Sequence, residues 1–327
     1  HEVEILSLPA RFWKWRMFGS ATSLAKQAES LGSFDAVVAT DMLDLAGFLG
    51  RTPWLAGVPT VLYMHENQLT YPLIEGAPAD DAYGFINWRS METATEVWFN
   101  SQFHLDEVFA ALPGLLRRFP DARHDDWVDE VLVRSHVMPV GVEAVASDGK
   151  GDRPLILWNH RWEYDKDPEA FFAALAAVDD LDWRLALVGE SFRQAPAEFE
   201  EAKERYADRL VAYGHLPRPE YEQLVAEASI VVSTARQEFF GVSVVEAAMA
   251  GAWPVVPDRL SYPSVFDEWA DRVIYSEGSL ADRLRNDVLD PPSDSQREAL
   301  SGYLKARYAW PVVADAYDRR LEALASG

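Results

Sequence analysis

The sequence contains no cysteine among its 327 residues. Disulfide bonds and thiolate metal sites are therefore excluded, and thiols say nothing about the redox state of its compartment. The chain also lacks any run of about eighteen apolar residues, the length that a membrane-spanning helix needs. No basic and apolar leader precedes the first predicted strand. We therefore expect a soluble, cytoplasmic protein that is not secreted.

Basic residues are scarce. The chain has 30 lysines and arginines against 53 aspartates and glutamates, and its net charge is −23. Broad electrostatic attraction to nucleic acid or to an anionic membrane requires a cationic surface, so this balance argues against both. Any contact with RNA must then be local. The acidity is equally explained by solubility in a salty cytoplasm.

Strands alternate with helical segments along the chain, a pattern typical of parallel sheets with crossover helices. The predicted strands are 3–8, 36–39, 60–64, 96–99 and 131–138, and then 155–158, 184–188, 210–213, 230–233 and 253–256. A stretch rich in Gly, Ala, Ser and Asp, 141–153, separates the two series. The pattern predicts two α/β domains, 1–145 and 146–306, followed by a terminal helix, 307–327, that packs back towards the first domain.

Glu238 and Glu246 bracket a predicted strand-to-helix turn. The amides of Phe240, Gly241 and Val242 would be unpaired at the helix start, where the positive end of the helix dipole favours a phosphate. Glycine at this point lets a ligand approach the backbone. The carboxylates, with seven residues between them, would hold hydroxyls on two parts of an extended ligand. The alternative is a surface helix with an acid at each end.

A second polar loop opens the second domain, directly after its first predicted strand. Arg161 and Lys166 could neutralise a pyrophosphate there, because α/β folds place ligands at the carboxyl ends of parallel strands. Asp165 and Asp167 also form a pattern that can hold a divalent metal. The intervening lysine opposes metal binding, and Asp167 precedes a proline as a predicted helix N-cap. The alternative for the two cations is a solvated loop in which they pair with Glu163 and Asp165.

Three strings then point to a family: MHENQLTYP at 64–72, NHRWEYDKDPE at 159–169 and EFFGV at 238–242. On these strings the chain resembles the tRNA-queuosine α-mannosyltransferases, within the retaining glycosyltransferases of family 4, which carry a Glu-x7-Glu motif. The resemblance covers nearly the whole chain. It implies the GT-B fold, an α/β architecture of two Rossmann-like domains facing across a cleft. It also implies transfer of mannose from GDP-mannose to the cyclopentene diol of queuosine in a tRNA anticodon.

The resemblance also implies roles for residues of the second domain. Arg161 and Lys166 would bind the donor diphosphate and stabilise its charge as the sugar leaves, in place of a metal. Glu238 would hold sugar hydroxyls, and Glu246 would accept the ribose hydroxyls. The leaving phosphate oxygen would help to deprotonate the acceptor, so no covalent catalyst is expected. The other donor-binding residues implied are Gly189, Gly214, His215, Leu216, Phe239, Phe240, Gly241 and Val242.

His65 follows the predicted strand 60–64. In the family a histidine in this region contacts the sugar, so the resemblance gives His65 a catalytic or sugar-positioning role, with Glu66 and Asn67 beside it on the acceptor side. The alternative is a histidine and an asparagine that satisfy a turn. Asn100 and Ser101 also end a predicted strand, where both are ordinary helix caps.

A tRNA acceptor requires a local face of basic and aromatic residues. The candidates are Arg11, Trp13 and Lys14 within 11–16, and Arg117, Arg118, Phe119, Arg123 and His124. The first group interleaves rings and charges, which suits stacking against unpaired bases. Each group is equally explained by a helix whose arginine stems cover apolar surface.

Relatives begin with a further strand, a Gly-rich turn and a helix before the position of His1. In a doubly wound sheet of order 3-2-1-4-5 that first strand is central, and its loss would leave unpaired backbone groups within the sheet. We therefore expect an incomplete chain whose amino-terminal domain lacks its first strand. A polypeptide that really started here would have an unstable first domain.

We therefore predict a two-domain retaining glycosyltransferase that uses a nucleotide sugar, GDP-mannose, without a metal, and acts on tRNA. Two alternatives stay open. One is an enzyme of the same architecture that acts on a lipid, glycan or small molecule, which the acidic surface favours. The other is a catalytically silent module that binds RNA or protein. Release of nucleotide from a sugar nucleotide separates both enzymes from the silent module.

Overall fold

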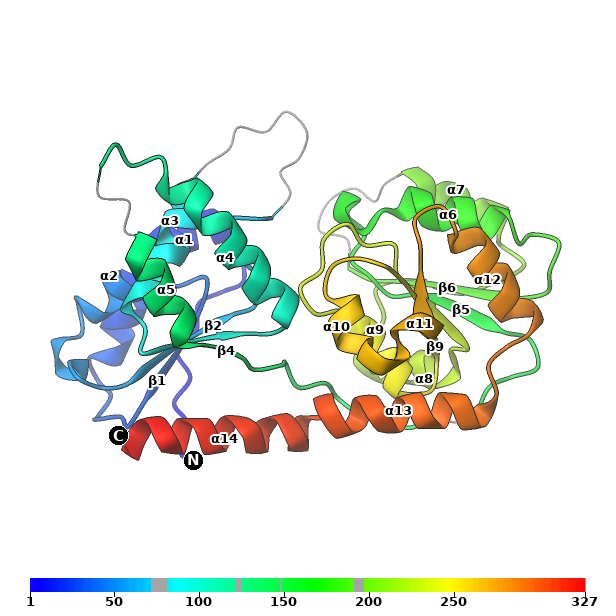
Figure 1. Cartoon of the computed structure of the whole chain (residues 1–327). Coiled ribbons are helices and arrows are strands. Elements are labelled where there is room, and N and C mark those ends of the chain that lie inside the picture. The colour runs from blue at the N-terminus through cyan, green and yellow to red at the C-terminus, as the bar shows by residue number, and fades with distance from the viewer. Residues whose placement is uncertain (72–80, 122–124, 148, 191–196, 327) are drawn as a thin grey trace. The chain divides into compact units, whose positions relative to one another are not determined.

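The computed structural model of the chain describes residues 1–71, 81–121, 125–147, 149–190 and 197–326. Three residues of the candidate segments lie outside these ranges: Pro72, Arg123 and His124. The chain forms two compact units (Figure 1). The first unit comprises His1–Pro139 and Ala314–Gly327, and the second unit comprises Val140–Val313.

A parallel sheet forms the centre of the first unit. Its strands in the described residues are, in spatial order, β1 (Val37–Thr40), β2 (Thr60–Met64), β3 (Glu96–Phe99) and β4 (Ser135–Val137). Helices carry the chain back between strands, so that each strand can run in the same direction as the last. The helices that share the core on one face are α1 (Trp13–Ala28), α2 (Leu45–Leu49), α3 (Ala82–Thr93), α4 (Gln102–Leu116) and α5 (Asp125–Val133).

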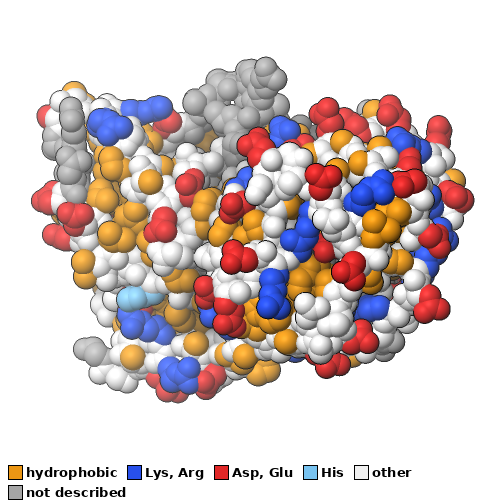
Figure 2. All heavy atoms as spheres, turned by 45° about the vertical axis from the view of Figure 1, so that its right-hand side comes forward, with side chains coloured by type: hydrophobic (Ala, Val, Ile, Leu, Met, Phe, Trp, Pro, Cys, Tyr) orange, Lys and Arg blue, Asp and Glu red, His pale blue; other side chains and the backbone are white. Residues whose placement is uncertain are grey.

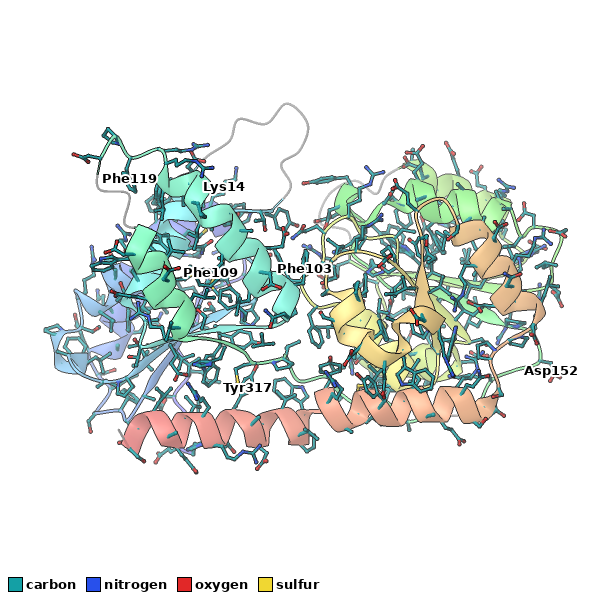
Figure 3. All side chains as sticks on the ribbon, in the orientation of Figure 1. Lys14, Phe103, Phe109, Phe119, Asp152 and Tyr317 are labelled. Atoms are coloured by element: carbon teal, nitrogen blue, oxygen red, sulfur yellow. The ribbon has the colours of Figure 1, made fainter. Side chains whose placement is uncertain are left out.

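Both faces of this sheet are covered. Successive side chains of a strand point to opposite faces, so a strand buried on both sides is apolar throughout. In β2, Leu62 and Met64 join the core beneath α1 to α5. Val61 and Tyr63 join a second cluster, against which Tyr317 of α14 (Trp310–Ser326) packs. Figure 3 shows Tyr317 directed from α14 towards the strands.

Polar contacts also hold α14 on this face. The Tyr317 hydroxyl lies 2.9 Å from the carbonyl oxygen of Pro139 and 3.2 Å from that of Met138. Arg320 donates to both carboxylate oxygens of Glu96, from Nε at 2.8 Å and from Nη2. Burial acts to raise the pKa of Glu96, but the hydrogen bonds from Arg320 and Trp98 outweigh it, so this pKa lies below its usual value. The carboxylate therefore stays charged opposite the guanidinium.

The second unit contains another parallel sheet. Its described strands, in spatial order, are β10 (Ile274–Tyr275), β9 (Trp253–Pro257), β8 (Ile230–Val232), β5 (Leu155–Trp158), β6 (Arg184–Val188) and β7 (Leu210–Gly214). On one face lie α6 (Pro168–Ala176), α7 (Ala197–Arg205) and α12 (Leu280–Leu289), and on the other lie α8 (Arg218–Glu227), α9 (Val242–Met249) and α13 (Asp294–Tyr308) (Figure 1). The short helices α10 (Tyr262–Phe266) and α11 (Ala270–Val273) precede β10.

The strand order of the second unit reverses between β5 and β8. From β5 the chain proceeds outwards to β6 and β7, and then returns to the other side of β5 to form β8, β9 and β10. The crossover connections on the two sides of such a point leave in opposite directions, so the loops separate and open a crevice at the carboxyl ends of the strands. This edge of the sheet is where a ligand site is expected.

Two predicted strands were wrong. The segment 3–8 forms no strand, and its Val3 and Ile5 are 69% and 82% exposed. A strand needs a neighbour for its ladder hydrogen bonds, and this segment pairs with none of the described strands. The predicted strand 131–138 begins too early, because Val128 and Val131 pack as one helical face of α5 and β4 starts only at Ser135.

The predicted terminal helix is two helices. It breaks at Ala309, whose backbone is extended, between α13 and α14. Pro311 has no N–H to donate to the carbonyl four residues back, so α13 cannot continue through it, whereas a proline is tolerated in the first turn of a new helix. The break is held within the second unit by Val142, whose N–H donates to Tyr308 and whose carbonyl accepts from Trp310.

Charges of both signs are mixed on the surface. Figure 2 shows acidic and basic side chains interspersed over the face turned to the viewer.

Within the described ranges, no helix combines the length and the apolar character needed to cross a membrane.

Truncation of Tyr317 should loosen α14. We expect Tyr317→Ala to destabilise the first unit by about 3 kcal/mol, because it removes a large ring from the packed sheet face. Tyr317→Phe keeps the ring and should cost only about 1 kcal/mol through its lost hydrogen bond. Urea unfolding followed by circular dichroism measures both. Equal effects of the two variants would contradict the dominance of ring packing.

His104 should make the stability of the first unit depend on pH. Burial, with help from His65, lowers the pKa of His104 to about 3. Between pH 7 and 5, His104 becomes protonated in the unfolded chain but stays neutral in the folded chain. The free energy of unfolding should therefore fall by about 2 kcal/mol over this range. Urea unfolding at the two pH values tests this. In His104→Gln, the fall in unfolding free energy between pH 7 and 5 should be smaller by the same amount. An unchanged fall would contradict the lowered pKa of His104.

Candidate functional site

Four loops of the second unit meet at the carboxyl edge of its sheet. Because the strands are parallel, the segments that follow them emerge on the same edge. These segments are Asn159 to Asp167 after β5, Gly189 and Glu190 after β6, His215 and Leu216 after β7, and Ser233 to Gly241 after β8. They contain most of the residues that the sequence singled out in this half of the chain.

A pocket of about 420 Å³ lies among these loops. Its lining residues are Asn159, Val188, Gly189, Glu190, His215, Leu216, Arg218 and Tyr221. The Asn159 amide donates to the Tyr221 hydroxyl at 3.0 Å and to the Ser243 carbonyl at 2.9 Å. Its oxygen is buried and has no partner among the described residues. Because a buried polar atom is costly to leave unpaired, this oxygen indicates a polar ligand or a water molecule.

Glu246 lies behind this pocket, in α9, and its side chain is almost fully buried. The charge is compensated by Arg218, whose Nη2 is 2.6 Å from Glu246 Oε1. The same guanidinium donates from Nε to Glu222 at 2.6 Å. Burial and the Glu246 charge together raise the pKa of Tyr221 far above its usual value, so its hydroxyl keeps its proton. Arg218 and Tyr221 thus line the pocket, and the buried carboxylate of Glu246 lies behind the Arg218 guanidinium.

Lys166 joins the loop after β5 to the loop after β8. Its Nζ donates to the Gln237 carbonyl at 2.6 Å, and lies 3.3 Å from both Glu238 Oε2 and Asp165 Oδ2. Its side chain is 8% exposed, so these partners compensate a buried positive charge. Burial acts to raise the pKa of Glu238, but Lys166 and then His160 outweigh it and lower this pKa. Glu238 is therefore a carboxylate near neutral pH.

Arg161 lies on the same loop and is more exposed. Its Nη1 is 3.5 Å from the Glu163 carboxylate, and 43% of its side chain is accessible. The neighbouring His160 is buried, and burial together with Lys166 lowers its pKa to about 4, so its ring is neutral. The pairings with neighbouring acids that the sequence offered as an alternative therefore do occur, for Arg161 with Glu163 and for Lys166 with Asp165.

Asp167 caps α6 as the sequence predicted. Its side chain accepts from Ala170 N at 3.4 Å and pairs with Arg236 at 2.9 Å. Its backbone is left-handed, with φ of 49°. In the part of the chain that the structure describes, no group of three or more His, Asp or Glu side chains is arranged to hold a metal ion.

Glycines allow the loops to approach each other closely. A Cβ at Gly189 would lie 1.9 Å from the carbonyl oxygen of His160, and Trp162 N donates to the Glu190 carbonyl across the same contact. Gly241 has φ of 91°, and a Cβ there would lie 2.9 Å from the Tyr262 ring. Only glycine fits these two positions without displacing its neighbours.

The start of α9 differs in one respect from the expectation. The Phe240 amide is not unpaired, because it donates to Glu238 Oε1 at 3.4 Å. Phe239 and Phe240 are buried, whereas Val242 is 44% exposed. Gly214 has φ of 89°, which turns the chain into His215 and Leu216 at the pocket. The side chain of Glu238 is thus held by its own loop and by Lys166.

His65 lies at the carboxyl edge of the sheet in the first unit, directly after β2. Its ring is 54% exposed, and its Nδ1 is 3.4 Å from the buried carboxylate of Asp41. Asn67 is fully buried, and its Oδ1 accepts from Leu69 N and Thr70 N, both at 2.9 Å. Glu66 accepts from the side chain of Gln68 at 3.1 Å. Asn67, which was predicted to contact the acceptor, therefore shapes the loop in this structure.

The segment 11–16 begins α1 and exposes aromatic rings. Phe12 is 71% exposed and left-handed, with φ of 58°. Trp13 packs on Tyr83 with ring centroids 5.3 Å apart, and the Lys14 ammonium lies 5.6 Å from the Trp13 ring. Arg11 lies 5.7 Å from the Phe12 ring. Figure 3 labels Lys14 on this helix. Rings and cations do alternate here on an exposed surface.

The second basic segment is more engaged within the first unit. Arg118 forms an ion pair with Asp81, and Phe119 packs on Phe85 with centroids 5.2 Å apart. Arg118 is therefore engaged in an ion pair and Phe119 in a ring contact, and the packing of the arginine stems on apolar surface stays a prediction.

Sequence reasoning missed Asp41, Arg218 and Tyr221. Arg218 and Tyr221 occupy the first turn of α8, directly after the loop that follows β7. Asp41 directly follows β1, in the same strand-end position as His65. The strand-end position of Asp41 was a usable signal, but nothing in the local spacing indicated that Arg218 pairs with Glu246.

The chain matches two family models. The model described as tRNA-queuosine alpha-mannosyltransferase N-terminal covers residues 1–142, and the model described as glycosyl transferases group 1 covers residues 143–305. Among solved structures, starch synthase IV from Arabidopsis thaliana is similar with a TM-score of 0.72 at 12% identity, over 98% of this chain and 79% of that one. Sucrose-phosphate synthase from Thermosynechococcus elongatus has a TM-score of 0.71 at 16% identity, over 97% and 80%. These likenesses show the GT-B fold.

Curated relatives show the family. A Drosophila melanogaster protein named tRNA-queuosine alpha-mannosyltransferase is 33% identical over 300 residues, which are 87% of this chain and 79% of that protein. A Xanthomonas oryzae protein named GDP-mannose:cellobiosyl-diphosphopolyprenol alpha-mannosyltransferase is 25% identical over 86% of this chain and 74% of its own length. With the GT-B fold and the strand-end loops described above, these matches show a glycosyltransferase, and the chain belongs to the tRNA-queuosine α-mannosyltransferase family.

Proposed function

We propose that this chain transfers mannose from GDP-mannose to queuosine in a tRNA anticodon, with retention at the transferred carbon. The observation that carries the proposal is the similarity to the Drosophila relative over most of both chains, together with the amino-terminal family model. The name of the Xanthomonas relative supports GDP-mannose as the donor. Because the acceptor is a tRNA, the proposal includes a cytoplasmic site of action.

The pocket of the second unit suits the nucleoside of the donor. Its polar groups converge on a space of about 420 Å³, which is within the usual range for small-molecule sites. Main-chain groups of Gly214, His215 and Leu216 would read the base edge. Glu246 would accept the ribose hydroxyls, and Arg218 holds its carboxylate in place. Gly189 lets the loops after β5 and β6 pack closely together beside this pocket.

The diphosphate and the sugar would lie between the loops that Lys166 joins. Arg161 is partly accessible and could contact the phosphates with its planar fork, whereas Lys166 supplies a fixed charge. We propose that these two cations, with the amides at the start of α9, stabilise the charge that develops on the leaving phosphate. Glu238, a carboxylate held by Lys166, would accept sugar hydroxyls. The proposal requires neither a metal nor a covalent nucleophile.

The first unit would supply the acceptor side. His65 presents an exposed ring at the edge of its sheet and would orient the sugar, with Glu66 on the same loop. Arg11, Trp13 and Lys14 would stack on and pair with unpaired nucleotides of the anticodon loop. The net charge of −23 restricts such contacts to a local surface.

Transfer to tRNA is the decisive test. The chain is incubated with GDP-mannose and tRNA that contains queuosine, and the digested nucleosides are analysed by mass spectrometry. We expect a queuosine heavier by one hexose, and no product with tRNA that carries guanosine at that position. Glu238→Ala and Arg161→Ala should each abolish transfer without unfolding the chain. Glu163→Ala, which removes only the ion-pair partner of Arg161, should keep most of the activity.

Two outcomes would contradict the proposal. GDP release that depends on a lipid, glycan or small molecule instead of tRNA would favour an enzyme of the same fold with another acceptor. No nucleotide release from any sugar nucleotide would favour a silent binding module. Wild-type transfer by either alanine variant would remove the assignment of that residue.

Glu246 should act on donor binding. We expect Glu246→Gln to raise KM for GDP-mannose by about 10-fold or more, because a charged hydrogen bond contributes about 1.5–3 kcal/mol. Glu222→Gln is the matched control, since Glu222 also accepts from Arg218 at 2.6 Å but lies on the exposed side. Steady-state kinetics of transfer measure both variants. Equal increases in KM would show that Arg218, and not the ribose contact, carries the effect.

A further inference from the structure

Asp41 is a buried carboxylate that the proposed reaction does not yet use. It directly follows β1, and it is 2% exposed. Its Oδ1 accepts from the backbone N–H of His65 at 3.0 Å and lies 3.4 Å from Nδ1 of the same residue. Among the described residues, His65 is the ionisable group within ion-pairing distance of this carboxylate.

The burial of Asp41 needs a reason. Removing a carboxylate from water costs several kcal/mol unless partners compensate it. An asparagine would accept the same backbone N–H without that cost. The buried carboxylate of Asp41 lies next to the His65 imidazole, which is 54% exposed. We therefore explain the burial of this charge by its effect on the imidazole ring.

The surrounding residues fix the backbone on both sides of this contact. The Asn87 amide donates to the Asp41 carbonyl at 3.0 Å, and the Asn100 amide donates to the His65 carbonyl at 2.8 Å. The Asp41 N–H donates to the Tyr63 carbonyl at 3.2 Å. The Tyr63 ring lies 4.6 Å from the His65 ring between centroids. The backbone of both residues is thus fixed, and the Nδ1 edge of the ring faces the carboxylate.

We propose that Asp41 is a positioning residue for His65. Its carboxylate holds the proton on Nδ1 of the ring, so that Nε2 presents a lone pair and accepts a hydrogen bond from a substrate hydroxyl. A carboxylate on one ring nitrogen selects the tautomer in this way. The separation of 3.4 Å is long for a hydrogen bond, and such contacts shorten when substrate binds. The identity of the hydroxyl rests on the proposed function. The tautomer of His65 does not depend on that function.

Kinetics test the effect on transfer. We expect Asp41→Asn to lower kcat about 10-fold to 100-fold, the loss seen when a carboxylate that orients a metal-bound histidine is removed, while KM for GDP-mannose stays within about 2-fold. Asp44→Asn is the matched control on the same loop. Asp44 caps α2 through Gly47 N, a cap that asparagine keeps. Asparagine loses the ion pair with Arg89, but that pair is at the surface and contributes little to stability. Asp44→Asn should therefore retain wild-type kcat.

A second background separates positioning from structure. In His65→Gln the ring is absent, so adding Asp41→Asn should change kcat by less than about 2-fold. An equal loss in both backgrounds would mean that Asp41 only supports the fold, and wild-type kcat in Asp41→Asn would overturn the proposal outright.

Nitrogen-15 spectra of the histidines give a readout that needs no activity. The His65 signals, assigned by their absence in His65→Gln, should show Nδ1 protonated in the wild type and a mixture of tautomers in Asp41→Asn. An unchanged tautomer would overturn the proposal. If the wild type fails to transfer mannose, the proposed function fails, and these spectra still decide whether Asp41 controls the ring.

Discussion

The buried ammonium of Lys166 is the contact on which the candidate donor site depends. It lies between the loop after β5 and the loop after β8, at the point where the strand order of the sheet reverses. A buried charge is tolerated only when its partners stay in place. The contacts of Lys166 therefore fix the positions of Gln237 and Glu238 relative to the loop after β5. The 8% exposure of its side chain makes this constraint strong. Glu238 consequently remains charged in a site where burial alone would favour its protonated form.

The first unit uses the same arrangement with different chemistry. Asp41, His65 and Asn100 follow β1, β2 and β3, and His65 contacts the other two at the carboxyl edge of a parallel sheet. Parallel strands bring their ends together regardless of the chain length between them. The rigidity of this edge comes from the sheet behind it, whose two faces are covered by α1 to α5 and by α14. Stable placement of the polar groups therefore depends on apolar packing.

Much of the fold could be predicted from apolar patterns. The strands β2, β3, β5 and β6 have the predicted bounds, because a strand buried on both faces is a short continuous apolar run. Errors arose where the local apolar pattern was clear but the structure depended on partners elsewhere in the chain. Residues 3–8 look like a strand, yet a strand exists only beside a neighbour. The short β10 offers two residues and hence no periodicity.

The sequence by itself determined the family and the fold class, because short strings at strand ends and alternating apolar segments are local properties of the chain. It also determined the cap at Asp167 and the glycine at 241, since each follows from the conformation of a few neighbouring residues. Only the tertiary structure decided which charges meet. Glu246 pairs with Arg218, Lys166 with Glu238, and Asp41 with His65 across 28, 72 and 24 positions of the chain. Such pairings depend on strand order and burial, which no local spacing encodes.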